Sequence, residues 1–456
     1  MNKVIIIGII GAVILSNINV GSISVRRTIE DNYLYTKISK LAETKEWTLM
    51  FYCGGDENPP ITGSRVLINL LEKYPYISNE KLNILVLLDY ADKSYFGQVK
   101  PMFGNIAKFE IIEEYDEINM GDYNTLKNFI IRCKQNYSAN RYFLQMIGHA
   151  RSFIGACYDD NITGDTQDET PYYLTMREIR DAIQVTDGVD IFATTGCLMG
   201  STECAYEFRN CTDVYISSEG IYDIKLVPVT ILKDLKIFRK YHVLSNYEIA
   251  EKIIKEFKIP SLISPYFTLS AIRTDKLNEI RKKIDTFVTL ITEDLDNYKE
   301  NINIAWLKAE HFEPLASLFI MIDIYGFVDL INKKTATKPI VIGENAEIEI
   351  TDIQLQNKRH IFEEELNVHI DKSTEIIDYK KDLDFETCVN DLKKAIENAT
   401  IAEIHRFGHK YAHGLSIYFP GNYYPDDPYY TVNYLEFTND SNWDEFLLEY
   451  LDTDFS

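Results

Sequence analysis

The chain has 456 residues, which is enough for one large domain or two to three ordinary ones. Apolar residues make up 46% of it, as in globular proteins with a full core, and 70 acidic against 47 basic residues give a net charge of −23. This charge disfavours a nucleic-acid partner or an anionic membrane surface, and is compatible with basic peptides or bound cations. Acidity also serves plain solubility, which requires no specific partner.

An apolar run over residues 4–15 follows a single Lys and precedes small polar residues. This order is typical of a signal peptide. The run of 12 residues is shorter than the roughly 20 that a membrane-spanning helix requires, and no second such run follows. We therefore expect residues 1–22 to be a signal peptide or N-terminal anchor, and the protein to be secreted or held at the cell surface. A buried first strand is the alternative.

Predicted strands and helices alternate from residue 46 to about 225. Helical spacing occurs at Ser64–Lys73 and Asp122–Tyr137, and Thr175 with Glu178 forms a capping box that begins another helix. Continuous apolar strands between such helices predict an α/β fold with a mostly parallel sheet, covered by helices on both faces. The predicted strands are Trp47–Cys53, Leu82–Asp89, Ala107–Ile112, Tyr142–Ile147, Val189–Thr194 and Val214–Ser217.

Helices dominate the pattern beyond residue 225, and no linker marks a boundary. We therefore expect a core over 46–225 and a helical C-terminal part over 226–456, which packs on the core and contributes helices and at least one further strand. The elements predicted there are a long amphipathic helix over Leu277–Leu295, an edge hairpin over Ile340–Ile353, a strand over His413–Phe419 and a final helix over Trp443–Leu451.

His149 and Cys197 end two of the apolar runs, YFLQMIGH and VDIFATTGC. Because parallel strands present their carboxyl ends at one edge of a sheet, we expect the imidazole and the thiol to meet there. A thiol beside an imidazole can act as a nucleophile with its base, and a helix beginning near Gly200 would favour the thiolate. The alternative is an inert core cysteine, since the chain has seven.

The segments around these two residues resemble the clostripain family of cysteine peptidases, in the caspase-like clan. The CLMG-x-x-E-x-AYE pattern is the most specific part of this resemblance, and GLSIYFP is the next. The resemblance implies a caspase-like fold and a cysteine endopeptidase, in which Cys197 forms a thioacyl-enzyme and His149 is acid and base. The matching segments are EWTLMFYCGGDEN (46–58), MIGHARS (146–152), CYDD (157–160), YYLTMREIRDAI (172–183), TTGCLMGSTECAYEFRNCTDVYISSEG (194–220), FTLSAIRTDKL (267–277), MIDIYGFVDLI (321–331) and HGLSIYFP (413–420).

The resemblance also implies an oxyanion hole made by the backbone N–H groups of Ala150 and Cys197. The chain departs from the family at two nearby points. The family usually has Gly after the catalytic His, where this chain has Ala150, and a positive φ at alanine would be strained. Asp-Ala usually precedes the Cys, where this chain has Thr195-Gly196. These departures leave an alternative open: a catalytically decayed relative that binds peptides or partners in the same cleft.

Relatives cleave after Arg or Lys and hold that side chain with an acid on the segment after the VYISSEG strand. Asp223 is the nearest candidate for this acid in the present chain, and Glu219 is the second. The resemblance therefore implies cleavage after Arg or Lys, because a pocket carboxylate pairs with a cationic side chain. The alternative is that Asp223 is an ordinary loop acid.

No cofactor is required for this chemistry, but several relatives depend on calcium. The loop at 157–169 offers Asp159, Asn161 and Asp165 as oxygen ligands, although Thr170 stands where a calcium loop usually has Glu. A solvated acidic loop is the alternative. We expect peptide or protein substrates, no nucleic-acid partner, no membrane contact beyond the N-terminal segment, and a monomer.

Other metal patterns are weak. None of the seven cysteines form a CxxC pair, which disfavours zinc. Their odd number leaves at least one thiol unpaired, and six could form disulfides. His405, His409 and His413 are spaced by four, as on one face of a helix, but Gly408 interrupts such a helix.

Overall fold

A computed structural model describes ten stretches of the chain, and Lys45–Ser456 forms one compact unit. The predicted signal peptide, the Ser64–Lys73 helix and the Ile340–Ile353 hairpin lie outside the described residues. Among the described helices, none is both long enough and apolar enough to cross a membrane. The described stretches are 44–54, 80–89, 93–101, 107–159, 173–258, 264–312, 321–332, 383–420, 430 and 434–452.

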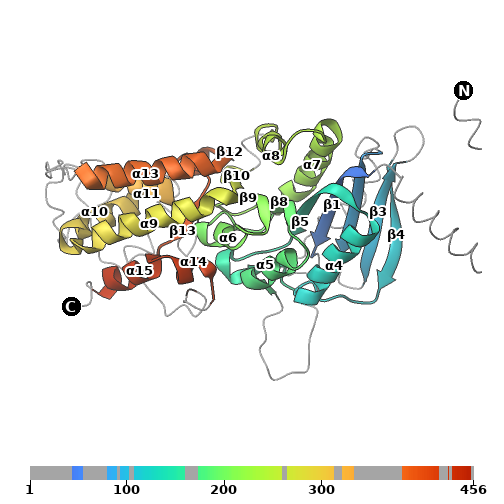
Figure 1. Ribbon diagram of the computed structural model, residues 1–456, viewed down its shortest axis with the longest axis horizontal. Helices are drawn as coiled ribbons and strands as arrows, with labels where there is room; N and C mark the ends of the chain where they lie inside the picture. The colour runs from blue at the N-terminus through green and yellow to red at the C-terminus, as the bar shows by residue number, and fades with distance from the viewer. Residues whose placement is uncertain are drawn as a thin grey trace, which may run out of the picture. The chain divides into compact units, whose positions relative to one another are not determined.

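A nine-stranded sheet organises this unit, in the order β12-β10-β9-β8-β5-β1-β2-β3-β4 (Figure 1). The five strands from β9 to β2 run parallel, and an antiparallel pair extends the sheet at each side. The strands are β1 (Lys45–Cys53), β2 (Leu82–Leu88), β3 (Ser94–Pro101), β4 (Ala107–Tyr115), β5 (Ala139–Ile147), β8 (Val189–Thr194), β9 (Thr212–Ser217), β10 (Thr268–Arg273) and β12 (Thr400–His405). This arrangement confirms the mostly parallel sheet.

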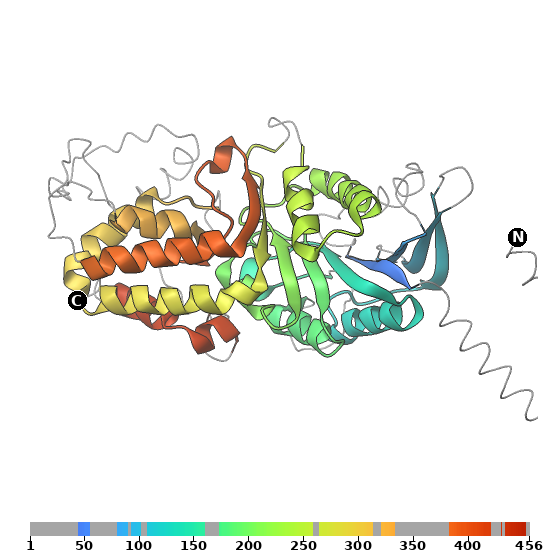
Figure 2. The same ribbon diagram turned by 45° about the horizontal axis from the view of Figure 1, so that its top comes forward.

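Helices cover both faces of the sheet, as predicted (Figures 1 and 2). Strand β1 shows why its sequence is continuously apolar, because alternate side chains enter two separate cores. Leu49 and Phe51 pack on the face covered by α7 (Val227–Tyr241) and α8 (Asn246–Lys255). Met50 and Tyr52 pack on the opposite face. The helices on that face are α4 (Tyr123–Asn136), α5 (Met176–Gln184) and α6 (Thr202–Glu207).

Local signals account for where these helices begin. Asp122 caps α4 by accepting hydrogen bonds from the backbone of Asn124 and Thr125. Thr175 and Glu178 form the predicted capping box at the start of α5. Both helices therefore begin within one residue of the position that the sequence indicates.

The C-terminal part extends the main sheet and adds a group of helices. Strand β10 pairs antiparallel with β9 and then with β12, so residues beyond 225 complete one side of the sheet. The chain leaves β10 through a 3-10 turn (Thr274–Lys276) into α9 and returns from α13 directly into β12, and these two helices lie side by side (Figure 2). The helices are α9 (Leu277–Thr292), α10 (Leu295–Lys308), α11 (Ile324–Asn332), α13 (Leu383–Ala399), α14 (Glu436–Asp440) and α15 (Trp443–Asp452).

Two predictions for this part were only partly right. The single helix expected over Leu277–Leu295 ends at Thr292, because Asp294 adopts a non-helical backbone with φ −141° and ψ 42° before α10 begins. The strand expected over His413–Phe419 is β13 (Ser416–Tyr418), and it pairs with β11 (Met321–Asp323) in a small separate sheet. A second small sheet joins β6 (Gly155–Ala156) to β7 (Leu174–Thr175).

A buried carboxylate joins the helix after Cys197 to the C-terminal part. Glu203, in the first turn of α6, is fully buried, and its Oε1 accepts hydrogen bonds from the backbone N–H of Tyr418 at 2.8 Å and the hydroxyl of Tyr430 at 2.9 Å. Ser416 donates its backbone N–H to Gly200 at 3.0 Å in the same joint. Burial raises the pKa of Glu203, and the bonds from Tyr418 and Tyr430 oppose that rise. The CLMGSTE and GLSIYFP segments thus contact each other through these hydrogen bonds.

We predict that Glu203→Ala lowers the free energy of unfolding by about 3 kcal/mol, because two buried donors lose their acceptor. Glu203→Gln keeps an acceptor oxygen at this position and should stay within about 1 kcal/mol of the wild type. Urea unfolding followed by circular dichroism measures both variants. Equal stability of Glu203→Ala and wild type would contradict the assigned role of this joint.

Candidate active site

Adjacent parallel strands carry His149 and Cys197. In the register of β5 and β8, Met146 lies opposite Thr194, and the next residue, Thr195, donates its backbone N–H to the carbonyl of Met146 at 3.1 Å. His149 follows the last residue of β5 by two positions and Cys197 follows the last residue of β8 by three. Both residues are partly exposed, whereas the last four residues of each strand that leads to them are buried. The structure therefore brings the imidazole and the thiol to one edge of the sheet.

The loop after His149 folds back on itself and touches the loop that carries Cys197. Arg151 donates its backbone N–H to Gly155 at 3.0 Å, and Cys157 donates to the carbonyl of His149 at 2.9 Å. These two bonds flank an antiparallel bridge between Ala150 and Ala156, so neither of them uses the amide of Ala150. The amide of Ser152 lies 3.5 Å from the carbonyl of Cys197.

Left-handed backbone conformations gather in these loops. Among the described non-glycine residues, φ is positive at Ser152 (46°), Cys157 (56°), Leu198 (61°) and one remote turn residue. Such conformations cost of order 1 kcal/mol each and are held by surrounding bonds, here the one from the Leu198 amide to Gly220 at 3.0 Å. Ala150 does not have a positive φ. The strain expected from alanine at this position is therefore absent.

Cys197 is the one partly exposed thiol of the seven cysteines, and none of the seven is in a disulfide. Its Sγ lies 4.0 Å from the carbonyl oxygen of Tyr222. The other six thiols are buried, and burial raises the pKa of Cys211 to about 12 and that of Cys388 to about 11. The disulfides that six cysteines could have formed do not occur.

The helix after Cys197 begins slightly later than predicted. Ser201 caps α6 by accepting from the backbone N–H of Cys204 at 3.1 Å, so the helix begins at Thr202 instead of near Gly200. It has six residues. Its dipole is therefore a minor influence on the thiol, because the effect falls off beyond the first turn.

The two candidate pocket acids lie in different surroundings. Asp223 is partly exposed, follows the residue whose carbonyl meets the Cys197 thiol, and accepts from the backbone N–H of Lys225 at 3.0 Å. Glu219 is 1% exposed and accepts from the backbone N–H of Gly414 at 3.0 Å. Burial and the nearby carboxyl of Asp323 raise the pKa of Glu219 well above its usual range. Glu219 offers almost no surface to a substrate, whereas Asp223 does.

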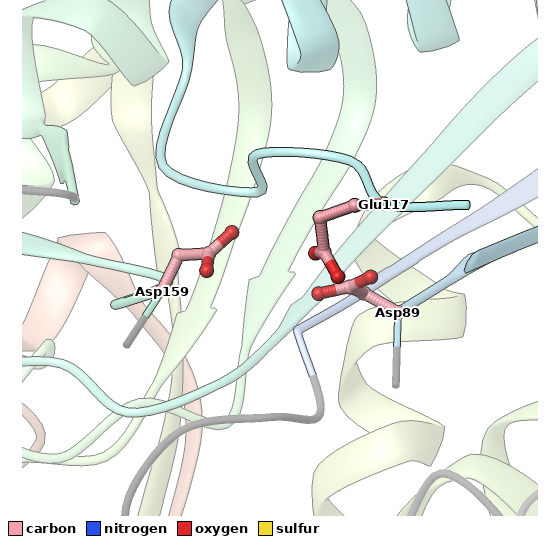
Figure 3. A group of neighbouring side chains, drawn as sticks. All are labelled: Asp89, Glu117 and Asp159. Atoms are coloured by element: carbon pink, nitrogen blue, oxygen red, sulfur yellow. The ribbon is translucent and has the colours of Figure 1, made fainter. Parts of the chain in front are cut away.

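Asp159 belongs to a group of three carboxylates (Figure 3). One oxygen each of Asp89, Glu117 and Asp159 lies within 4.8 Å of the others, and the side chains point toward one another. Asp89 and Asp159 are buried, at 0% and 1% exposure, while Glu117 is exposed. Asn161 and Asp165 lie outside the described residues. An all-oxygen donor set of this kind suits a hard cation such as calcium, which also reduces repulsion between buried carboxylates.

Sequence reasoning missed Asp89 and Glu117 as neighbours of Asp159. Asp89 directly follows β2, so its position at the carboxyl end of a parallel strand was a usable signal. Glu117 lies in the loop between β4 and α4, where no pattern distinguishes it from other exposed acids.

The three evenly spaced histidines do not share a site. Each pairs with its own carboxylate: His405 with Glu403 at 3.0 Å, His409 with Glu310 at 3.1 Å, and His413 with Asp323 at 2.9 Å. His405 ends β12 and His409 lies in a short 3-10 turn, so the helical alignment that would point them together is absent. The three histidines therefore make three separate contacts with carboxylates.

A mostly parallel, two-sided sheet with a cysteine and a histidine at the ends of neighbouring strands defines a caspase-like α/β protein. The model of the clostripain family matches residues 63–450, and the chain belongs to this family. Clostripain from Hathewaya histolytica is 30% identical over 205 residues, which is 38% of this chain and 38% of that protein. The match thus spans about two fifths of this relative's length.

Two solved structures share the fold along their whole length. A secreted C11 cysteine protease from Bacteroides thetaiotaomicron, in complex with an irreversible peptide inhibitor, superposes with a TM-score of 0.57 at 14% identity, covering 88% of this chain and 99% of that one. An inactive zymogen C11 protease from Parabacteroides distasonis gives 0.56 at 16% identity, covering 89% and 98%. At these identities the comparison establishes the caspase-like fold.

Proposed function

We propose that this protein is a cysteine endopeptidase that hydrolyses peptide bonds through a thioacyl-enzyme on Cys197, with His149 as acid and base. The observation that carries this proposal is the partly exposed thiol of Cys197 at the end of β8, beside His149 at the end of β5. Membership of the clostripain family supports it. The proteases among the similar structures support it as well.

The proposed reaction has two steps. The Cys197 thiolate attacks the peptide carbonyl carbon, a C–S bond forms, and the C–N bond breaks as protonated His149 gives its proton to the leaving amine. Water then loses a proton to His149 and attacks the thioester, so that a C–O bond forms and the C–S bond breaks. The thiolate and the protonated imidazole are restored, and no external oxidant or cofactor takes part.

The amides of Ala150 and Cys197 are our candidates for the oxyanion hole. The neighbouring amides of Arg151, Gly196 and Leu198 hold the two loops through bonds to Gly155, Thr194 and Gly220. The backbone N–H of Ala150 takes part in neither of the two hydrogen bonds that close its loop, Arg151 to Gly155 and Cys157 to His149. Ala150 also has no positive φ, so its backbone is not strained there. This geometry removes one reason for regarding the chain as catalytically decayed, and no contact in the described site favours that alternative.

We also propose a preference for Arg or Lys before the cleaved bond, with Asp223 as the pocket acid. Its support is the position of Asp223 next to Tyr222, whose carbonyl contacts the nucleophile. Partial exposure would let the Asp223 carboxylate meet a cationic side chain, and the burial of Glu219 makes it the weaker candidate.

A bound calcium ion is proposed at Asp89, Glu117 and Asp159, with Asn161 and Asp165 as further oxygen ligands. The cation would act by holding the ends of β2 and of the His149 loop together, and no catalytic step is assigned to it. Export is proposed from the apolar run at residues 4–15 and from the secreted relative in Bacteroides thetaiotaomicron.

The first prediction from this proposed function concerns the nucleophile. Iodoacetamide should label Cys197 and abolish peptide hydrolysis while the six buried thiols stay unmodified in the folded protein. Cys197→Ala and His149→Ala should each lower kcat by at least about 10³-fold, whereas the remote control Cys388→Ala should keep it. Peptide mapping and a fluorogenic peptide assay measure these effects. Full activity in Cys197→Ala would disprove the proposal.

The second prediction concerns specificity. Substrates with Arg or Lys before the cleaved bond should be preferred by roughly two orders of magnitude in kcat/KM, which corresponds to ~3 kcal/mol. Asp223→Asn should remove most of this preference, because it deletes the charge that pairs with the cation, while Asp296→Asn on α10 should not. A peptide-library profile with Asp, Asn or an apolar residue at this position would refute the pocket and leave the Cys–His mechanism intact.

The third prediction concerns the cation. Millimolar calcium should raise the melting temperature of the full chain, and a chelator should reverse the gain, because binding to the folded state stabilises it. Glu117→Gln should weaken this response at least about tenfold in calcium concentration, and Asp116→Asn, which removes one exposed charge nearby, should not. Identical melting curves with calcium and with excess chelator would argue for a merely solvated acidic group.

The fourth prediction concerns export. Protein recovered from the culture medium or cell surface should begin after about residue 20 if the signal is cleaved. Intact-mass measurement gives the first residue directly. Met1 retained on a protein found only in the cytoplasm would contradict export.

A further inference from the structure

The residues next to His149 and Cys197 touch each other. A Cβ atom built on Gly196 would lie 2.4 Å from the Cβ of Ala150 and 3.0 Å from the Cγ of Met199. Real Cβ atoms essentially never approach another heavy atom closer than 3.0 Å. The methyl group of Ala150 therefore occupies the space that a side chain at position 196 would need, and the backbone of Gly196 lies directly against it.

Neither side of this contact can yield easily. Gly196 donates its backbone N–H to the Thr194 hydroxyl at 3.0 Å, and the preceding amide, of Thr195, is bonded to Met146 of the neighbouring strand. Met199 is fully buried. Ala150 is fixed by its bridge to Ala156. Two hydrogen-bonded loops thus meet through one methyl group.

We propose that Ala150 and Gly196 are a positioning pair, whose contact sets the approach of the His149 imidazole to the Cys197 thiol. This inference rests on the proposed function, because it assigns the pair to the same reaction. Position 150 follows the base and position 196 precedes the nucleophile, so any change in their separation moves the two reacting groups relative to each other. The space between positions 150 and 196 holds one methyl group, which belongs to Ala150.

The size of the expected effect follows from the clash. An ordinary van der Waals contact begins near 3.4 Å, so a methyl at position 196 must open the 2.4 Å gap by about 1 Å. A misplacement of about 1 Å at reacting groups costs roughly 10²-fold in rate. Once the methyl is removed from position 150, the nearest atoms to a Cβ at position 196 are the Cγ of Met199 at 3.0 Å and the hydroxyl oxygen of Thr194 at 3.3 Å, so the required shift falls from about 1 Å to a few tenths of an ångström.

The test is a double-mutant cycle on the full chain. Gly196→Ala should lower kcat about 100-fold with KM changed less than about threefold, and should slow alkylation of Cys197 by iodoacetamide across the pH range. Ala150→Gly should cost about two- to fivefold. The double variant Ala150→Gly/Gly196→Ala should recover both rates to within about fivefold of the wild type, because the volume in the gap is restored.

Gly97→Ala is the matched control. A Cβ at Gly97 would lie 2.4 Å from Cζ of Phe109 and 2.8 Å from the backbone carbonyl oxygen of Glu110, between β3 and β4, so it creates a clash at the same shortest distance away from the site. This variant should lower the melting temperature and leave kcat and the alkylation profile unchanged. If Gly196→Ala caused only a general packing defect, it would lower the melting temperature as Gly97→Ala does and would leave the reactivity of Cys197 unchanged.

The alkylation readout separates this inference from the proposed function. If the wild type hydrolyses no peptide, the proposed function fails, and the pair is still judged by the pH profile of Cys197 alkylation in the four proteins of the cycle. Wild-type alkylation and turnover in Gly196→Ala would overturn the inference. A double variant no faster than Gly196→Ala would overturn it too.

Discussion

The carboxylate of Glu203 is the contact on which the rest of the structure depends. It lies six residues after Cys197, fully buried, and accepts hydrogen bonds from Tyr418 and Tyr430, more than 200 positions away in the chain. A buried carboxylate is costly unless it is hydrogen-bonded, so this contact fixes one arrangement of the helix after the nucleophile and the strand β13. Glu207, one turn further, pairs with Arg180 at 2.7 Å and accepts from the backbone of Glu436 at 2.6 Å. The C-terminal part is therefore held against the loop that carries Cys197.

Parallel strand order then concentrates polar chemistry at one edge of the sheet. His149 follows β5, Cys197 follows β8, Asp89 follows β2, and the segment with Asp223 follows β9. Most side chains of the strands pack into two apolar cores, and His149, Cys197 and Asp89 follow the ends of their strands. The left-handed residues Ser152, Cys157 and Leu198 lie in the loops that carry His149 and Cys197, so costly backbone conformations occur at the same edge.

The sequence predicted the elements whose identity is decided locally. Continuous apolar runs located β1, β2, β5 and β8, while helical spacing located α4 and a capping box located α5 almost to the residue. It did not predict β3, β10 or β12, three antiparallel strands that depend on their partners more than on their own pattern, although it did predict the antiparallel β4 from its run at Ala107–Ile112. The partners of Asp159 and the burial of Glu219 were not predictable for the same reason: both depend on which distant segments the fold brings together.

Packing also explains how two departures from a family pattern can belong together. Compared position by position, Ala150 and Gly196 each differ from the family, and each difference alone suggests a damaged site. Packing acts on volumes shared between neighbours, and a Cβ built on Gly196 would lie only 2.4 Å from the Cβ of Ala150, so positions 150 and 196 share one small space. An alanine on one side requires a glycine on the other, so the two changes leave the total volume between the loops unaltered. A motif comparison counts Ala150 and Gly196 as two differences, beside a third at Thr195, whereas in the fold the changes at 150 and 196 are one volume-conserving exchange that bears on the approach of His149 to Cys197.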